Sequence, residues 1–381
     1  MSMKIVFEKA KLLDAIAPAL GVVSDRNTMT AIEGILVASA GSDKVEISAY
    51  DLEKGMKTSL EARVIDPGSC VINAGKLSRI LRVMPDADIT VEVNDRGIAK
   101  IHSGKSQFEL HVLPAEDFPH LPELSGERGF TLSQAEFKKI VSQISHAIAQ
   151  NDQRPAINGA FITIKGSRMT AVATDGSRIA LREKVCEFGN LNRSGEELDL
   201  EFIVPGKALG EVMKLLDGED NVTIMLGRKH AIFVCGNVCF FTRMIDSEYI
   251  NYERFIPTES KMNAIVDREK LISALECALL VTEDRTLGQA KSPVKLNFED
   301  GSLTISSTSV SGSFADEIEI EKDGCDLLIG FNCRYLLDAL RAAEGDRVKI
   351  SGSTSLICVL IEAVEEKEED RFLYLVLPVK M

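Results

Sequence analysis

A threefold internal repeat constrains this chain more than any other feature of its sequence. A strand that runs into a helix occurs as CVINAGKLSRILRVMPDAD, as FIVPGKALGEVMKLLDGED and as LLIGFNCRYLLDALRAAEGD. The acidic turns that close these segments are 132 and 126 residues apart, at Asp88, Asp220 and Asp346. In each copy apolar residues recur at helical spacing after a turn that contains glycine. A chain with this period is expected to fold as three copies of one supersecondary arrangement.

Two further segments recur in every copy. One is an earlier helix, so helices are expected over residues 8–21, 75–84, 133–149, 206–216, 267–281 and 332–343. The other is a closing segment, which reads FELHVLPAEDFP, FFTRMIDSEYINYERFIP and FLYLVLPVKM in chain order. Each copy thus uses a β-α-β-β-β half-unit twice, which predicts an α+β fold of three repeated domains. Clusters of turn-forming residues divide these domains at 1–126, 127–258 and 259–381.

Composition places the chain among globular proteins without a membrane segment. Hydrophobic residues make up 45% and charged residues 27% of its 381 residues, close to the average for soluble domains. Charged residues interrupt each apolar run before it reaches the roughly 18 residues that a membrane helix needs. They also break up the N-terminus, where a signal peptide would be apolar. We therefore expect a cytoplasmic protein with no membrane partner.

The eight cysteines fall singly inside apolar segments, which is typical of reduced thiols that pack as small hydrophobic residues. Only Cys235 and Cys239 approach a metal-ligand spacing, and no second pair of cysteines accompanies them. The sequence therefore predicts no metal site and no cofactor.

A search for catalytic motifs finds none. P-loop, dinucleotide-binding, HExxH and GxSxG patterns do not occur, and the five histidines are scattered. The segment ATDGSRIAL is the one place where an acid, a hydroxyl and a base cluster. Asp175 could act there as a general base with Arg178 as an anion holder, but Asp-Gly between alternating strands favours a hairpin turn. We expect no catalytic residues and no enzyme, while a binding site around the turn remains open.

The threefold repeat, ATDGSRIAL, VLPAEDFP in the first copy and the terminal LVLPVKM together resemble the β sliding clamp family of bacterial DNA polymerase III. The resemblance spans the whole chain. It implies a DNA-clamp fold in which two chains close head to tail into a ring, with helices lining the hole and sheets outside. Twelve helices with axes about 9 Å apart would enclose an opening on the order of 25 Å, which is wide enough for a duplex.

This family resemblance implies a DNA sliding clamp, a processivity factor that tethers the replicative polymerase and has no catalytic residues of its own. The implied partners are a second copy of the chain in a homodimer, double-stranded DNA irrespective of sequence, and the clamp loader complex. They also include DNA polymerase III alpha or PolC-type polymerases, other polymerases, and repair proteins bearing Gln-Leu-(Ser/Asp)-Leu-Phe-like motifs.

Charge bears on the implied DNA contact in two ways. The net charge of −14 argues against a protein that coats DNA, but the six expected helices together carry +5 and the rest of the chain −19. A mildly basic lining would hold phosphates loosely enough to slide. The expected DNA-binding residues on these helices are Lys76, Arg79, Arg82, Lys138, Lys139, Lys207, Lys214, Arg334 and Arg341. Arg26 matches a DNA-contacting arginine of the family; each of the helix residues could instead belong to an ordinary solvated face.

The family's second site is a peptide pocket between its second and third domains. The residues that match it are Ile157, Thr174, Gly176, Ser177, Arg178, Ile179, Ile250, Arg254, Phe255, Leu356, Cys358, Leu375, Leu377, Pro378 and Val379. Most are apolar, as a groove for Leu and Phe anchors requires.

The sequence departs from the family pattern at several of these positions. Pro155 and Ala156 replace aromatic residues of some members, which leaves single-strand binding there open. Ser177 replaces a frequent histidine, Ile250 a proline, and Phe255 a smaller aliphatic residue. These changes alter the shape of the expected pocket and keep its apolar character.

The expected dimer seam joins the first domain of one chain to the third domain of its partner. Phe108 and Leu110 match family interface positions on one side, and Leu280 and Val281 on the other. Both pairs could equally be internal core. An alternative function also stays open, that of a peptide-binding scaffold with the same fold that encircles no DNA.

Overall fold

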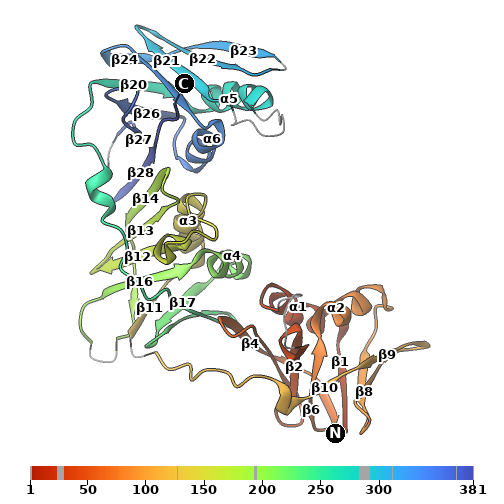
Figure 1. Ribbon diagram of the computed structural model, residues 1–381. Coiled ribbons are helices and arrows are strands. Elements are labelled where there is room, and N and C mark those ends of the chain that lie inside the picture. Colours follow the sequence, from red (N-terminus) through yellow and green to blue (C-terminus); the bar gives the residue numbers. More distant parts are fainter. Residues whose placement is uncertain are drawn as a thin grey trace. The chain divides into compact units, whose positions relative to one another are not determined.

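The computed structural model describes residues 2–23, 30–126, 128–192, 195–282, 292–310, 312–365 and 367–380. The chain forms two compact units. The first contains Met1–Lys138, Phe188–Glu196 and Lys207–Met244, and the second contains Lys139–Glu187, Glu197–Gly206 and Ile245–Met381. The first and third sequence repeats fall in different units, and the second repeat contributes strands to both (Figure 1).

Two antiparallel sheets build the first unit. The smaller has the order β5 (Arg63–Asp66), β1 (Met3–Phe7), β7 (Ile89–Val93), β8 (Ile98–Ser103), β9 (Ser106–His111). The larger has the order β10 (Leu113–Pro114), β6 (Ser69–Asn73), β2 (Gly34–Ser39), β3 (Lys44–Tyr50), β4 (Lys54–Glu61), β19 (Val238–Arg243), β18 (His230–Cys235), β17 (Asn221–Leu226), β11 (Arg128–Ser133), β15 (Gly189–Asn190). The pairing of β4 with β19 joins the first and second repeats in one ten-stranded sheet.

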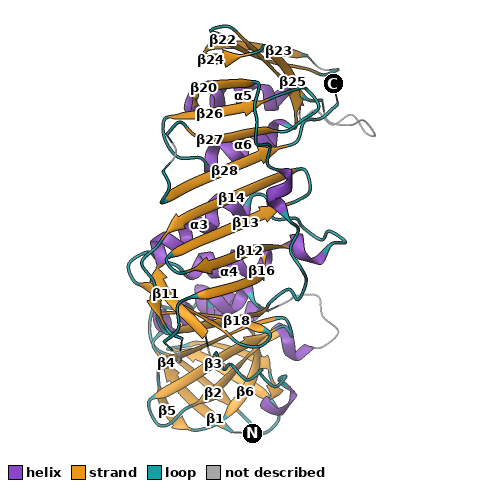
Figure 2. Cartoon of the chain, turned by 90° about the vertical axis from the view of Figure 1, so that its left-hand side faces the viewer, coloured by secondary structure: helices purple, strands orange, loops and turns teal. Residues whose placement is uncertain are grey.

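The second unit repeats this plan. Its larger sheet has the order β16 (Asp199–Pro205), β12 (Gly159–Lys165), β13 (Arg168–Thr174), β14 (Arg178–Val185), β28 (Asp370–Val376), β27 (Val359–Ala363), β26 (Arg347–Gly352), β20 (Met262–Asp267), β24 (Glu321–Gly324). The smaller sheet has the order β23 (Ser313–Glu319), β22 (Ser302–Thr308), β21 (Val294–Glu299), β25 (Leu327–Phe331). Here β14 pairs with β28, so the second and third repeats also share a continuous sheet (Figure 2).

Six α-helices accompany these sheets in the described residues: α1 (Lys9–Ile16), α2 (Ala74–Val83), α3 (Gln134–Ser145), α4 (Gly206–Leu215), α5 (Arg268–Thr282) and α6 (Cys333–Ala342). In the first unit α1 packs on α2 and β4. In the second unit α5 packs on α6 and on β21, β22 and β23, while α6 also contacts β28. The order of strands and helices confirms the predicted pair of β-α-β-β-β half-units in each repeat.

Side-chain caps and proline explain where helices begin and end. The side chains of Asn73, Asp267 and Asn332 accept hydrogen bonds from first-turn backbone N–H groups of α2, α5 and α6, which otherwise lack partners. Four expected helices agree with the structure to within one residue. The first expected helix was too long, because Pro18 starts a separate 3-10 turn (Pro18–Gly21) after Ile16. The expected helix over 133–149 was also too long, since α3 ends at Ser145.

Apolar side chains fill each unit separately. Fully buried phenylalanines of the first unit include Phe7, Phe130 and Phe233. Phe118, from the VLPAEDFP segment, packs with Tyr50 and others in a cluster that bridges the first two repeats. The motif thus contributes a core side chain. Among the described residues, no helix is long and apolar enough to cross a membrane.

Candidate functional sites

The expected peptide-pocket residues gather in the second unit, where the hairpins β13–β14 and β27–β28 meet. Ile179, Cys358 and Leu375 are buried in one apolar cluster, and Ile250 packs against it. Burial raises the pKa of the Cys358 thiol, which disfavours the reactive thiolate. Ile157 is also fully buried. These side chains therefore form an apolar base.

Large apolar side chains stay exposed around this base. Phe255 is 59% exposed, Leu356 87% and Leu377 42%. Phe255 ends a short helical turn (Tyr252–Phe255) whose neighbours Tyr252 and Ile256 pack against the buried cluster. Isolated exposed apolar residues are ordinary, but several beside one apolar cluster are typical of a binding surface.

The C-terminal segment leaves this cluster after Leu377. The Leu377 N–H donates to the Ser177 carbonyl at 2.9 Å, which continues the pairing of β28 beside β14. The Val379 N–H instead donates to the Gly330 carbonyl of β25. Val379 lines a separate pocket of about 280 Å³ with Leu279 and other residues of the third repeat. The structure thus holds the Leu377 backbone beside the β13–β14 turn and directs Val379 toward β25.

The hairpin hypothesis for ATDGSRIAL is confirmed, since β13 and β14 pair antiparallel on either side of the turn. Gly176 has a φ of 88°, a conformation that favours glycine. The Asp175 carboxylate accepts from the backbone N–H groups of Ser177 (2.9 Å) and Arg178 (3.2 Å). Thr174 Oγ1 donates to the Arg178 carbonyl and accepts from the Gly176 N–H. The Asp175 side chain therefore serves the turn, which gives no support to a general-base role.

Arg178 lies at the centre of a polar cluster beneath this turn. Its Nε donates to Asp175 Oδ2 at 3.0 Å and its Nη1 to Asp338 Oδ2 of α6 at 2.7 Å. Nη2 donates to the His146 carbonyl, and the guanidinium lies 4.3 Å from the centre of the Tyr335 ring. Burial first, and then the nearby charge of Arg178, lower the pKa of His146 to about 4.

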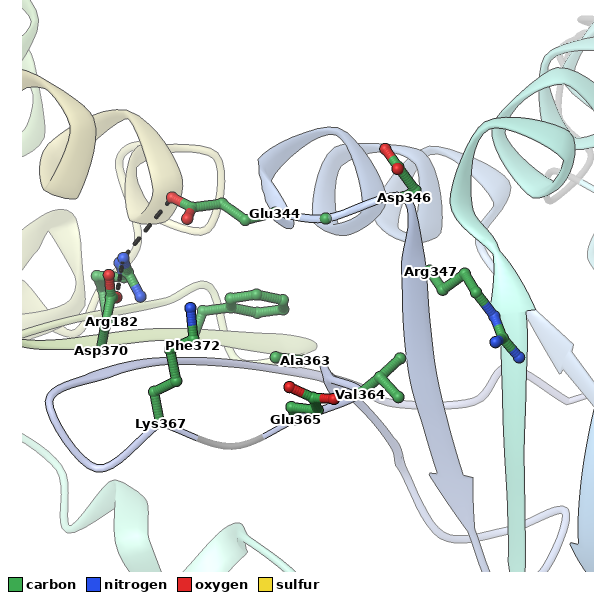
Figure 3. Close-up of a pocket in the computed structure, with 11 residues that line it drawn as sticks. Arg182, Glu344, Asp346, Arg347, Ala363, Val364, Glu365, Lys367, Asp370 and Phe372 are labelled. Atoms are coloured by element: carbon green, nitrogen blue, oxygen red, sulfur yellow. Dashed lines mark ion pairs between the residues drawn. The ribbon is translucent and has the colours of Figure 1, made fainter.

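A second arginine of β14 was not anticipated from the sequence. Arg182 is 1% exposed and pairs with Asp370 of β28 and, at 3.6 Å, with Glu344 after α6. Figure 3 shows both pairs at one side of a cavity of about 440 Å³, whose lining includes Phe372. Burial opposes the charge of Glu344, but hydrogen bonds from Lys139 and Gln143 and the charge of Arg182 hold its pKa below the usual range. Alternate residues of a strand share a face, so the spacing of Arg178 and Arg182 places both side chains on one face of β14. This spacing was the signal in the sequence that could have identified Arg182 as a partner of the site.

Sequence reasoning also missed several aromatic and apolar residues of the cluster. Tyr249 stacks on Phe161 with ring centroids 4.9 Å apart, and its hydroxyl donates to the Val172 carbonyl. Leu360 and Leu373 complete the base from β27 and β28. The alternation of apolar residues along these two strands is visible in the sequence. Which face of the strands lies toward the hairpin β13–β14 depends, however, on the pairing of β14 with β28.

The nine described residues of the expected DNA-binding set are all exposed. Lys76, Arg79 and Arg82 follow one another at helical spacing on α2. Lys138 Nζ donates to the Leu216 carbonyl. Three others pair with carboxylates, Lys139 with Glu344, Lys214 with Glu211 and Arg341 with Glu276. Arg26 lies outside the described residues.

The expected dimer residues lie at the ends of the two smaller sheets or beside them. Phe108 and Leu110 belong to β9, an edge strand of the five-stranded sheet, and Phe108 is exposed. Leu280 and Val281 lie in the last turns of α5, and Leu280 is exposed. The alternative that these positions are core therefore does not hold for Phe108 or Leu280. The strand β23 is likewise an edge of its sheet.

Comparison with known proteins covers nearly all of the chain. Sequence profiles of the DNA polymerase III beta subunit match the N-terminal domain over residues 3–122, the central domain over 131–251 and the C-terminal domain over 253–380. The "Beta sliding clamp" of Bacillus subtilis (strain 168) is 29% identical, and the alignment covers 99% of this chain and 100% of that protein.

Comparison with solved structures gives the same relationship as comparison of sequences. A crystal structure of the DNA polymerase sliding clamp from Bacillus subtilis is 27% identical with a TM-score of 0.91, and a sliding clamp from Pseudomonas aeruginosa bound to griselimycin is 26% identical with a TM-score of 0.87. Both alignments cover 100% of each chain. Three successive domain matches and this shared fold show that the chain belongs to the DNA polymerase III beta subunit family, the beta sliding clamps.

Proposed function

We propose that this protein is a DNA sliding clamp, a homodimeric ring that encircles duplex DNA and tethers the replicative polymerase and other replication or repair proteins. Membership in the beta subunit family carries this proposal. The role is that of a processivity factor in the cytoplasm, which binds and positions enzymes and has no catalytic residues of its own. The three domains of the proposed clamp are residues 1–126, 127–258 and 259–381.

The helices support the DNA-facing part of the proposal. Each chain supplies six described α-helices, so two chains would supply twelve. Exposed basic residues on α2, α3, α4 and α6 would meet phosphates without reading base sequence. Several of these residues are already paired with carboxylates, which would keep their contacts to DNA weak and exchangeable. Ring closure would use β9 with Phe108 and Leu110 on one chain and the third domain, with Leu280 and Val281, on its partner.

The apolar cluster supports the tethering part. A buried base formed by Ile179, Cys358 and Leu375 with exposed Phe255, Leu356 and Leu377 beside it suits Leu and Phe anchors of a Gln-Leu-(Ser/Asp)-Leu-Phe-like motif. Polymerases of the alpha or PolC type, repair proteins and the clamp loader would compete for it. Each buried anchor contributes roughly 1.5 to 3 kcal/mol, and ordering the peptide consumes much of this.

A labelled Gln-Leu-Ser-Leu-Phe peptide is expected to bind with micromolar affinity, about −8 kcal/mol, in a fluorescence polarisation titration. Removing the last five residues should abolish binding, because the truncation deletes Leu377 and its hydrogen bond to Ser177. Leu377→Ala should weaken binding by about tenfold without unfolding the protein, since it removes exposed surface rather than core.

Leu191→Ala provides a matched control, because Leu191 is also 42% exposed but lies in the first unit. It should leave peptide affinity unchanged. Equal affinity of Leu377→Ala and the unaltered protein would count against the pocket. No binding to the intact protein would mean that Ile250 and Phe255 have reshaped the site, or that the tethering role is wrong.

One observation favours the second candidate function, a peptide-binding scaffold that does not encircle DNA. The chain is acidic overall, with a net charge of −14, and the carboxylates of Glu344, Glu211 and Glu276 partly neutralise its basic helix faces. Such a scaffold would bind the same peptide and show no retention on circular DNA.

A further inference from the structure

The side chain of Arg178 is committed to acceptors of its own chain. It is only 11% exposed. Its three guanidinium nitrogens donate to the Asp175 carboxylate, the Asp338 carboxylate and the His146 carbonyl, and one face covers the Tyr335 ring. A guanidinium that is so little exposed and has these partners is poorly placed to bind an incoming peptide directly.

These contacts exceed what the hairpin turn needs. An Asp-Gly turn closes through its own backbone and the Asp side chain. Asp338 lies on α6 and His146 follows α3, so both belong to elements outside the hairpin. Burying an arginine is costly unless it is paired, and Asp338 supplies the shorter of its two carboxylate contacts, at 2.7 Å against 3.0 Å for Asp175.

A continuous series of hydrogen bonds connects Asp338 to the exposed side of the apolar cluster. Asp338 accepts from Arg178, and Arg178 donates to Asp175. Asp175 accepts from the Ser177 N–H, and the Ser177 carbonyl accepts from the Leu377 N–H. The series ends at the backbone of Leu377, whose exposed side chain is proposed to meet the peptide.

We propose that Asp338 is a positioning residue for the peptide pocket: acting through Arg178, it fixes the turn at Asp175–Ser177 and thereby the backbone of Leu377. This inference rests on the proposed peptide-binding function. A preformed turn binds a peptide more tightly than one that must be ordered first. Affinity for the polymerase motif thus depends on a helix α6 carboxylate that the peptide never touches.

The test compares Asp338→Asn with the unaltered protein in two measurements. Asn keeps the shape of the side chain and removes its charge. Polarisation of the labelled Gln-Leu-Ser-Leu-Phe peptide should show about tenfold weaker binding. Amide hydrogen exchange at Ser177 and Leu377 should accelerate, while exchange in α5 and β21 stays unchanged.

Two further variants separate positioning from general destabilisation. Asp338→Glu restores the charge and should return affinity to within about threefold of the unaltered protein. Glu276→Gln removes a different carboxylate, on α5, which pairs at 2.6 Å with Arg341 of α6, the helix that also carries Asp338. This variant should change neither measurement.

The outcomes distinguish this inference from the proposed function. Equal peptide binding by Asp338→Asn and the unaltered protein would overturn the positioning role. Faster exchange throughout the third repeat would overturn it too, because Asp338 would then only stabilise the fold. If no form of the protein binds the peptide, the proposed tethering function fails. The hydrogen-exchange measurement then still tests the positioning role, because unchanged exchange at Ser177 and Leu377 in Asp338→Asn would overturn the effect of Asp338 on the turn.

Discussion

Replacing Arg182 with alanine is expected to lower the free energy of unfolding of the second unit by about 3 kcal/mol. The side chain is 1% exposed and faces the carboxylates of Asp370 and Glu344 (Figure 3). Its removal takes the buried counter-charge away from Asp370, leaves Glu344 with Lys139, and opens space in the joint between β14 and β28. The value lies at the low end for a broken buried ion pair, because water reaches both carboxylates.

Arg371→Ala is the matched control for this loss. Arg371 neighbours Asp370 on β28, but it is 38% exposed and its contacts to Glu183 and Glu362 are 3.7 and 3.5 Å long. Its removal should cost less than about 1 kcal/mol. Chemical denaturation followed by tyrosine fluorescence suits the comparison, since the chain has no tryptophan and four of its five tyrosines lie in the second unit. A smaller loss for Arg182→Ala than for Arg371→Ala would contradict the role assigned to the buried pair.

Acidification from pH 6.5 to pH 4.5 is expected to remove about 2 kcal/mol from the stability of the second unit through His146 alone. Burial and Arg178 lower the pKa of this histidine to about 4, against 6.5 in the unfolded chain. Asp338 and Asp175 act in the opposite direction, and the Tyr374 ring packs against the imidazole. Between these two pH values the unfolded state binds the extra proton, so stability is complete above pH 6.5 and falls as the pH drops.

His146→Gln should flatten this dependence, because it removes the titrating group. The lowered pKa of Glu344 makes a separate contribution, present above pH 4.5 and lost only below it. Denaturation midpoints are measured at intervals from pH 7 to 4.5, and the difference between His146→Gln and the unaltered protein isolates this histidine from His230, whose pKa burial also lowers. His120→Gln removes an exposed imidazole of the first unit and serves as the control. An identical pH slope for His146→Gln and the unaltered protein would contradict the assignment.

The repeat made most of the fold predictable. Helical spacing located α2, α4, α5 and α6 to within one residue, and the Asp-Gly pair located the β13–β14 turn. Expectations were least accurate where a helix ends without a clear stop signal, as after Ser145 of α3. The pairing of β4 with β19 and of β14 with β28 was not predictable, because registers between distant strands depend on packing across repeats.

The candidate site was predictable in its apolar part and less so in its polar part. Resemblance to a family supplied Ile179, Cys358 and Leu375, which share one cluster. It also placed Arg178 in the pocket, but the partners of Arg178 on α6 and after α3 depend on contacts about 160 and 32 residues away in sequence. Periodicity within a segment carries no information about such partners.

Retention on circular DNA tests most directly whether this protein encircles a duplex. The protein would be loaded onto a nicked circular plasmid by a clamp loader with ATP and then separated from free protein by gel filtration in high salt. A sliding clamp should remain with the circle and be released after one restriction cut, because it can leave only over a DNA end. Equal retention on circular and linear plasmid, or loss from both as salt rises, would indicate electrostatic binding and contradict the ring.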